Sequence, residues 1–263
     1  MLNSSPTPKQ LGYYFPAEFA KHDAMWLSWP HKEASWPGKL DSIFPSYVEF
    51  IKIVSLTERV CINVVDTVMQ KKATDLLIAG GVDLSRVQFY IHPTNDAWCR
   101  DHGPSFLIRK NKEQPKAIVD WNINAWGGKY PPYDLDDVIP THIGKALNLP
   151  VFYPNIIMEG GSVDFNGAGS VLTSKCCLLN PNRNPELSQD QIESYLCNYY
   201  GVEQVLWVSE GIVGDDTDGH IDDTVRFVNE DTVLTVVEDN KSDENYPILK
   251  HNLKQLQSMR LLN

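Results

Sequence analysis

The segment from Gly214 to Asp223 carries the residue types that perform acid–base chemistry. Its last nine residues contain five carboxylates and one imidazole, that of His220. The chain after His220 is apolar and β-branched, which predicts a strand, and residues i and i+2 of a strand point to one face. His220 and Asp222 are therefore expected to project together, as a general acid–base imidazole beside an orienting carboxylate. A solvated acidic loop and a calcium-type loop of oxygen ligands are the alternative interpretations.

A second polar loop covers residues 95–104, with the sequence NDAWCRDHGP. It places Asp96 and Asp101 on either side of Trp98, between two predicted strands. Binding and catalytic residues are commonly carried by loops on a rigid scaffold. A turn held by its Asn, Gly and Pro residues, with an Asp–Arg ion pair, is the alternative interpretation.

A third candidate loop is MEGGSVD at 158–164, in which Glu159 precedes two glycines. Adjacent glycines let the backbone approach a ligand closely. The segment is too short for a phosphate-binding loop and lacks the lysine of that motif. A plain turn is the alternative.

Several carboxylates that converge need a cation, and a metal ion or a guanidinium group could supply it. A guanidinium is planar, permanently charged and pairs bidentately with carboxylates. Trp98 favours the guanidinium, because an aromatic face suits a planar cation, whereas a hard metal ion makes no use of it. The candidate carboxylates are Asp96, Asp101, Glu159, Asp218 and Asp222.

Composition indicates an ordinary globular protein with 263 residues, 42% hydrophobic and 22% charged. The net charge of −11 argues against nucleic acid as a partner and would weakly steer a cationic substrate. Five cysteines without a CxxC pair indicate a reducing compartment and argue against a zinc site. The N-terminus lacks the features of a signal peptide, and no apolar run approaches the roughly 18 residues of a membrane span, so we expect a cytoplasmic protein without a membrane partner. A homo-oligomer is left open.

Helices and strands are expected to alternate along the chain. The hydrophobic pattern and the helix caps predict helices at 41–56, 67–79, 135–147, 188–201 and 250–261. Strands are expected at 59–65, 87–91, 105–108, 116–121, around Val163 and Val171, and at 176–179, 204–208, 224–228 and 232–237. The recurrence of these elements indicates a repeat architecture, after an irregular segment at 1–15. The helix at 250–261 would leave its last unit incomplete.

Three sequence blocks resemble one known family. WCRDHGP at 98–104, MEGGSVDFNG at 158–167 and DTDGHIDDTVRFV at 216–228 are similar to the signature blocks of the agmatine deiminase and Porphyromonas-type peptidyl-arginine deiminase family. PAEFAKHDAMWLSWPH at 16–31 resembles its N-terminal block, so the resemblance covers most of the chain in family order. It implies an α/β fold, the five-bladed α/β propeller (pentein fold) of ββαβ-type units, as one domain over 1–263 whose last blade is incomplete.

The resemblance also implies an activity, hydrolysis of a guanidine to a urea with release of ammonia, without metal or cofactor. By resemblance, Asp101 and Glu159 hold the guanidinium with Trp98 against it, His220 is the acid–base residue and Asp222 a further carboxylate. Asp218 and Asp96 are further substrate-binding candidates. A chain without a signal peptide favours agmatine, giving N-carbamoylputrescine, over peptidyl-arginine.

The family's nucleophilic cysteine lies near its C-terminus in a glycine-rich motif, and no cysteine here matches that motif. We therefore expect a C-terminally truncated chain that lacks the nucleophile and is inactive by itself. A non-catalytic module that binds guanidines or polyamines is one alternative. A divalent-metal hydrolase built on residues 215–223 is the other.

Overall fold

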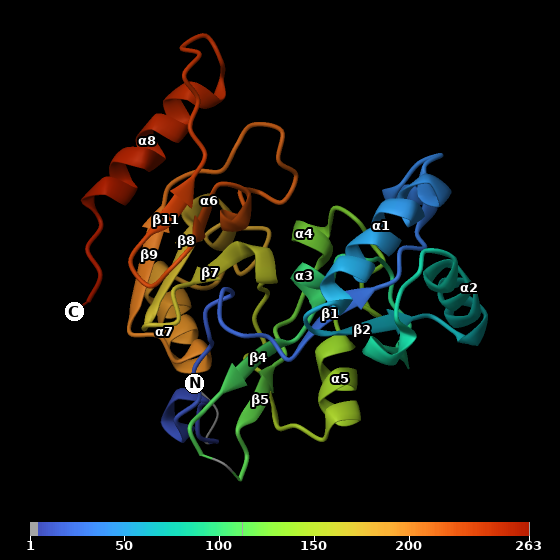
Figure 1. Ribbon diagram of the computed structural model, residues 1–263. Coiled ribbons are helices and arrows are strands. Elements are labelled where there is room, and N and C mark those ends of the chain that lie inside the picture. Colours follow the sequence, from blue (N-terminus) through green and yellow to red (C-terminus); the bar gives the residue numbers. More distant parts are fainter. Residues whose placement is uncertain (1–4, 112, 263) are drawn as a thin grey trace.

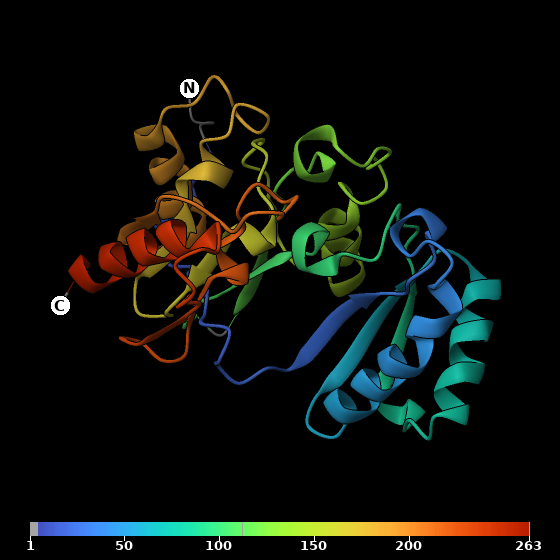
Figure 2. The same cartoon turned by 90° about the horizontal axis from the view of Figure 1, so that it is seen from above.

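The computed structural model describes residues 5–111 and 113–262. These residues form four small sheets with helices beside them (Figures 1 and 2). Three of the sheets have three strands and the fourth has two. None of the helices in these residues is both long enough and apolar enough to cross a membrane.

The first unit is a parallel sheet whose strands are joined by two helices. Its elements are β1 (Ala24–Ser28), α1 (Leu40–Ser55), β2 (Arg59–Val64), α2 (Thr67–Ala79) and β3 (Val87–Ile91). Val60, Ile62 and Val64, at alternate positions of β2, form one buried cluster with Ile51 of α1 and Leu77 of α2. Because alternate residues of a strand share a face, both helices cover the same face of this sheet.

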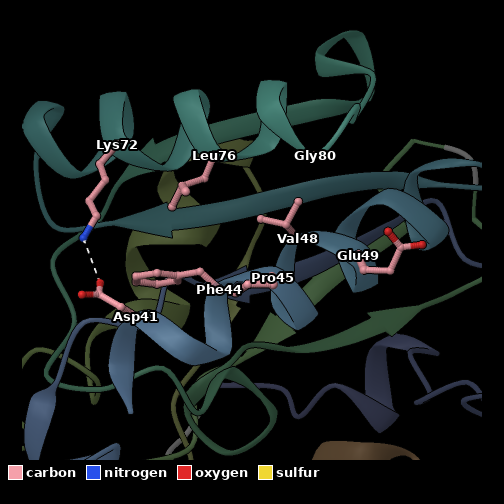
Figure 3. Close-up of a pocket in the computed structure, with 8 residues that line it drawn as sticks. All are labelled: Asp41, Phe44, Pro45, Val48, Glu49, Lys72, Leu76 and Gly80. Atoms are coloured by element: carbon pink, nitrogen blue, oxygen red, sulfur yellow. Dashed lines mark ion pairs between the residues drawn. The ribbon is translucent and has the colours of Figure 1, made fainter. Parts of the chain in front are cut away.

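A groove between α1 and α2 opens on the outer side of this unit (Figure 3). Lys72 of α2 pairs with Asp41 of α1 across it, at 3.6 Å, and also lies over the ring of Phe44. This groove holds one surface ion pair and no cluster of ionisable groups, so the candidate site lies elsewhere. Its lining residues are Asp41, Phe44, Pro45, Val48, Glu49, Lys72, Leu76 and Gly80.

The second and third units repeat one order of elements. An antiparallel pair comes first, helices follow, and a last strand pairs in parallel with the second strand of the antiparallel pair. The second contains β4 (Ser105–Ile108), β5 (Lys116–Val119), α4 (Ala125–Gly128), α5 (Ile139–Leu147) and β6 (Val151–Phe152). The third contains β7 (Val163–Phe165), β8 (Ser170–Ser174), α6 (Lys175–Leu178), α7 (Gln189–Tyr200) and β9 (Gln204–Val208). The recurrence expected from the sequence is therefore present.

The fourth unit begins in the same way, with the antiparallel pair β10 (Val225–Phe227) and β11 (Val233–Thr235), followed by α8 (Asn245–Ser258). Within the described residues its sheet has two strands. α8 lies on the opposite side of the molecule from the first unit (Figures 1 and 2).

A core cluster runs through the second and third units and fixes the N-terminal segment. Tyr200, at the end of α7, is 1% exposed, and its ring contacts Phe15, Trp121 and Phe165. Its hydroxyl shares a hydrogen bond with Ser105. The aromatic residues of the N-terminal segment therefore pack against the third unit.

Most predicted elements are confirmed, and their ends agree within a few residues. The capping box at Ser188 and Gln191 begins α7, and Gly201 in a left-handed conformation ends it. The strand expected at 176–179 is wrong, because α6 occupies those positions; a short apolar run does not distinguish a strand from a helix. In the irregular segment predicted at 1–15, residues 1–4 lie outside the described residues, and Lys9–Leu11 forms a 3-10 turn.

Candidate active site

Three short helical turns bring the candidate residues together. They are α3 (Cys99–His102), η4 (Gly160–Ser162) and η5 (Ile221–Asp223). Each stands just before the first strand of an antiparallel pair, β4, β7 or β10. α3 contacts η4, and η4 contacts η5. Because these units repeat the same order of elements, equivalent loops meet, and the three polar segments of the sequence form one site.

Asp101 is held by hydrogen bonds to both of its carboxylate oxygens. The backbone N–H of Gly161 donates to Oδ1 at 2.9 Å, and the indole N–H of Trp126 donates to Oδ2 at 3.0 Å. The same Oδ1 lies 3.7 Å from Nδ1 of His220. The carboxylate of Asp101 therefore points into the site and toward His220, as the sequence predicts.

Gly161 occupies a position that has no room for a side chain. A Cβ atom there would lie 2.4 Å from Nδ1 of His220 and 2.9 Å from Oδ1 of Asp101. At Gly160 a Cβ would lie 2.1 Å from the backbone oxygen of Arg100. The two glycines therefore let η4 pack directly against α3 and His220.

His220 is buried between acidic groups. Its Nδ1 lies 3.7 Å from Asp101 and 4.0 Å from Oδ1 of Asp222, and its side chain is 4% exposed. Its Nε2 is buried without a hydrogen-bond partner. The ring is therefore fixed beside carboxylates on one side, with an unpaired nitrogen on the other.

The structural reason predicted for the His220–Asp222 proximity is wrong. The residues after His220 form the 3-10 turn η5, and the strand begins only at Val225. The β-branched residues predict a strand correctly only from Val225 onward. The turn nevertheless brings Nδ1 of His220 to 4.0 Å from Oδ1 of Asp222.

Glu159 is the most deeply buried acid of the site. Its side chain is 1% exposed, and its Oε1 accepts from Nε of Arg183 at 2.7 Å. Its Oε2 is buried and has no hydrogen-bond partner. Burial raises the pKa of Glu159, and the positive charge of Arg183 opposes this effect. One oxygen is therefore fixed by the protein, and the other is unpaired.

Asp218 joins the site through Arg183. Nη1 of Arg183 donates to Oδ2 of Asp218 at 2.8 Å, and Lys129 pairs with Oδ1 at 2.7 Å. Burial opposes ionisation of Asp218, but hydrogen bonds from Lys129, Asn182 and Arg183 outweigh it and lower its pKa to about 2. Both oxygens of Asp218 are therefore engaged by cations of the protein.

Asp222 lies near Nδ1 of His220, as Asp101 does, and is paired with Arg100. Its Oδ2 lies 3.1 Å from Nε of Arg100, and Nη1 of the same arginine pairs with Glu18 at 3.0 Å. Burial raises the pKa of Asp222 to about 6, although Arg100 and His220 oppose the shift. The buried Glu159 and the half-buried Asp222 thus both hold protons more tightly than they do in water.

Trp98 and Asp96 extend from the same loop in different directions. Trp98 is 40% exposed, stacks on Trp36 and meets Trp126 edge to face, with ring centroids 5.4 and 6.5 Å away. Since Trp126 donates to Asp101, Trp98 lies at the border of the site. Asp96 is buried, accepts hydrogen bonds from Ser35 and its own loop, and pairs with Lys32 at 3.5 Å. These partners of Asp96 lie outside the cluster around His220.

Sequence reasoning missed Arg183, the pairing of Arg100 with Asp222 and the place of Cys177 beside the site. Arg183 holds Glu159, and Arg100 holds Asp222. Cys177 is fully buried, and it also lies beside Glu159 and His220, with one ligand atom of each residue within 4.8 Å of the others. Arg183 is the single cation in the segment NPNRNP at 180–185. Because a buried carboxylate needs a partner, this isolated arginine could have been predicted to pair with a site carboxylate.

The acidic segment 215–223 is organised by hydrogen bonds within the protein. Asp215 accepts from the hydroxyl of Thr217 and from the backbone N–H of Gly219. Asp216 accepts from the hydroxyl of Tyr130, and Asp218 binds Lys129. In the part of the chain that the structure describes, the only group of three potential metal ligands includes His220 from this segment and none of its carboxylates.

A family model supplies the decisive comparison. The model of Porphyromonas-type peptidyl-arginine deiminase matches residues 14–263, nearly the whole chain. The chain belongs to this family. A protein of Legionella pneumophila (strain Paris), provisionally named as an agmatine deiminase, is 40% identical over 254 residues, covering 96% of this chain and 71% of that protein.

Solved structures of family members have the same fold. The agmatine deiminase of Enterococcus faecalis matches with a TM-score of 0.89 and 31% identity, covering 98% of this chain and 70% of that chain. A cysteine-to-serine variant of a C. jejuni agmatine deiminase with substrate bound matches with a TM-score of 0.83 and 32% identity. The match covers 93% of this chain and 71% of that chain. The expected α/β propeller fold is thereby confirmed, and this chain spans about 70% of the length of these family members.

Proposed function

We propose that the site around His220 binds a guanidinium group and serves its hydrolysis, with agmatine as the substrate. The observation that carries the proposal is the unpaired, buried Oε2 of Glu159. Glu159 lies beside the imidazole of His220, whose Nδ1 is 3.7 and 4.0 Å from two further carboxylates. A buried carboxylate oxygen without a donor is costly. A ligand that donates two or more N–H groups from one plane relieves that cost, and a guanidinium has this geometry.

The charges in the site support a cationic ligand. Arg183 binds one oxygen of Glu159, and Arg100 binds one oxygen of Asp222. Each acid is thus fixed by one oxygen, and the second oxygen of Glu159 has no partner. Trp98 offers an exposed ring at the border of the site, against which the alkyl stem of agmatine can lie. The support for agmatine as the guanidine comes from the relatives named agmatine deiminase.

Peptidyl-arginine is the second candidate, because the family model carries that name. The two substrates differ in the group at the end of the alkyl stem, an amine in agmatine and a peptide backbone in peptidyl-arginine. Comparing the affinity of the chain for agmatine and for an N-acyl-arginine amide separates them. A preference for the amide would replace agmatine in the proposal.

We propose that hydrolysis at this site proceeds through covalent chemistry on a cysteine thiolate, without a metal. A thiolate attacks the guanidinium carbon, His220 protonates the departing nitrogen, and ammonia leaves. His220 then takes one proton from water as the water oxygen attacks the same carbon and displaces the thiolate. The second proton of the water leaves to solvent, which gives the neutral urea. Glu159 and Asp101 hold the guanidinium nitrogens so that the carbon is in line for attack.

None of the five cysteines of this chain has the surroundings of such a nucleophile. Cys177 is closest to His220, but it is fully buried, and burial raises its pKa well above the usual value of a thiol. Burial likewise raises the pKa of Cys61, Cys176 and Cys197. Cys99 is half-buried in α3 and lies outside the group formed by Glu159, Cys177 and His220. We therefore propose that this chain binds agmatine without turning it over.

The proposal is tested by calorimetric titration of agmatine into the purified chain. Asp101→Asn should weaken binding by at least about 30-fold, because truncating one partner of a buried charge pair costs about 2 kcal/mol or more. Asp239→Asn, at an exposed carboxylate after β11, is the matched control and should bind like the parent. Equal affinity in parent, Asp101→Asn and control would overturn the assignment.

A further inference from the structure

A group of three potential metal ligands lies inside the site. Glu159, Cys177 and His220 each offer one ligand atom, and these atoms all lie within 4.8 Å of one another. Within residues 5–111 and 113–262 no other group of three lies this close together. All three residues are buried, so the group is shielded from bulk water.

Two of these residues have polar atoms that lack partners. Oε2 of Glu159 and Nε2 of His220 are buried, and neither has a hydrogen-bond partner within the protein. Their side chains are only 1% and 4% exposed. Buried polar atoms are nearly always paired, so two unpaired atoms beside one thiol indicate a ligand that accepts electron pairs from all three.

The protein backbone holds the three groups near one another. Cys177 lies in α6, directly after β8, and the hydroxyl of Ser174 at the end of β8 donates to the backbone oxygen of Gly219, next to His220. Gly219 itself packs closely against Cys176, because a Cβ there would lie 2.3 Å from that sulfur. Arg183 binds Oε1 of Glu159 and leaves Oε2 free. The arrangement thus positions one atom of each residue.

The donor set is one sulfur, one imidazole nitrogen and one carboxylate oxygen. Magnesium and calcium prefer oxygen ligands alone, whereas Zn²⁺ accepts all three kinds in tetrahedral sites. Bond lengths of about 2.0 to 2.3 Å require ligand atoms about 3.3 to 3.8 Å apart, so the cluster must contract by roughly an ångström. Three protein ligands leave the fourth tetrahedral position to water.

We propose that Glu159, Cys177 and His220 bind Zn²⁺ and that the ion competes with the guanidinium substrate for this site. The thiol of Cys177 loses its proton to solvent as the zinc–sulfur bond forms. The competition rests on the proposed function, because it requires Glu159 and His220 to contact the guanidinium. The metal site itself does not rest on it. Its single cysteine has no CxxC partner, which is why the sequence pattern argued against zinc.

The metal site is tested by titrating the full chain with Zn²⁺ by calorimetry and with Co²⁺ by absorbance. Co²⁺ should give the near-ultraviolet charge-transfer band of a cobalt–thiolate bond. Cys177→Ala should abolish the band and weaken Zn²⁺ binding by more than about tenfold, because even mutations behind a metal ligand cost 10- to 100-fold. Cys197→Ala, in α7 and outside the cluster, is the matched control, and it should keep both the cobalt–thiolate band and the Zn²⁺ affinity of the parent.

His220→Gln is a second variant that leaves the core around Cys177 unchanged, and it should also weaken Zn²⁺ binding. Absence of Zn²⁺ binding by the parent, or equal affinity in the Cys177→Ala and Cys197→Ala chains, would overturn the metal site. The competition is tested separately, by titrating Zn²⁺ in saturating agmatine, which should raise the apparent dissociation constant. Simultaneous binding would refute the competition. Zinc binding without any agmatine binding would refute the proposed function and leave the metal site standing.

Discussion

Single side chains behind the site fix the direction of its acidic groups. Arg183 holds one oxygen of Glu159, and Trp126 holds one oxygen of Asp101. Buried carboxylates without such partners would be protonated or would turn away. The site therefore depends on residues that would not themselves touch the substrate.

Gly161 gives a prediction at the same scale. Gly161→Ala should abolish agmatine binding, because the added Cβ would lie 2.4 Å from His220 and 2.9 Å from Asp101. Overpacking of this kind costs about 1 to 3 kcal/mol, so a folded chain with a displaced imidazole is expected. Calorimetry measures the binding, and circular dichroism measures the fold. Asp239→Asn, at an exposed carboxylate, is the control; parent-like binding in both chains would contradict the packing argument.

At the scale of elements, the equivalent position of three turns creates the site. α3, η4 and η5 each precede the first strand of an antiparallel pair. The strands contribute buried apolar side chains to the core, whereas the polar residues of the candidate site lie in or beside the three short turns. This division explains why the polar segments of the sequence, separated by about sixty residues each, become neighbours.

Asp120 offers a test of how β5 is joined to α5. It lies just after β5 and accepts a hydrogen bond from Thr141 of α5. Burial raises the pKa of Asp120 to about 6. Repulsion from Asp137 adds to this rise, and hydrogen bonds from Thr141 oppose it. The folded protein therefore retains this proton where the unfolded chain has lost it, so its contribution to stability is present below about pH 4 and is lost as pH rises through about 6.

Asp120→Asn removes the charge and keeps an oxygen for Thr141. Relative to the parent, the variant should gain on the order of 1 to 3 kcal/mol of unfolding free energy between pH 4 and pH 7. Urea denaturation at a series of pH values measures this difference. The Asp239→Asn control should show a flat difference, and a flat difference for Asp120→Asn would contradict the linkage.

The sequence predicts the elements of this chain better than the contacts between them. Periodicity and capping residues locate α1, α2 and α7, because these signals are local. The short apolar stretch at Cys176 and Cys177 gives no such signal, and the strand predicted there is a helix. Arg183 was missed because its pairing with Glu159 joins residues 24 positions apart across two loops. Residue types located the three site segments, and the resemblance to a family then implied roles for their residues.

At the scale of the whole molecule, the described residues form four units of the propeller fold and gather several acidic groups around one imidazole. The fourth unit has its antiparallel pair and α8. Burial raises the thiol pKa of Cys61, Cys176, Cys177 and Cys197, which disfavours the thiolate that a nucleophile requires. We therefore expect this chain to bind agmatine without turning it over.

The turnover prediction belongs to this scale. The purified 263-residue chain should release no ammonia from agmatine above the rate of a boiled sample. Water alone attacks a delocalised guanidinium carbon poorly without the covalent step that divides the barrier. A coupled ammonia assay measures the rate. Turnover that disappears in Cys99→Ser or in Cys177→Ala would identify that cysteine as the nucleophile and refute the prediction.

The most direct test of the guanidinium site is a crystal structure of the chain grown with saturating agmatine. The guanidinium nitrogens should lie within hydrogen-bond distance of Oε2 of Glu159 and of the Asp101 carboxylate, beside the ring of His220. Agmatine bound elsewhere, or a crystal in which Oε2 of Glu159 stays unpaired at that concentration, would contradict the guanidinium site.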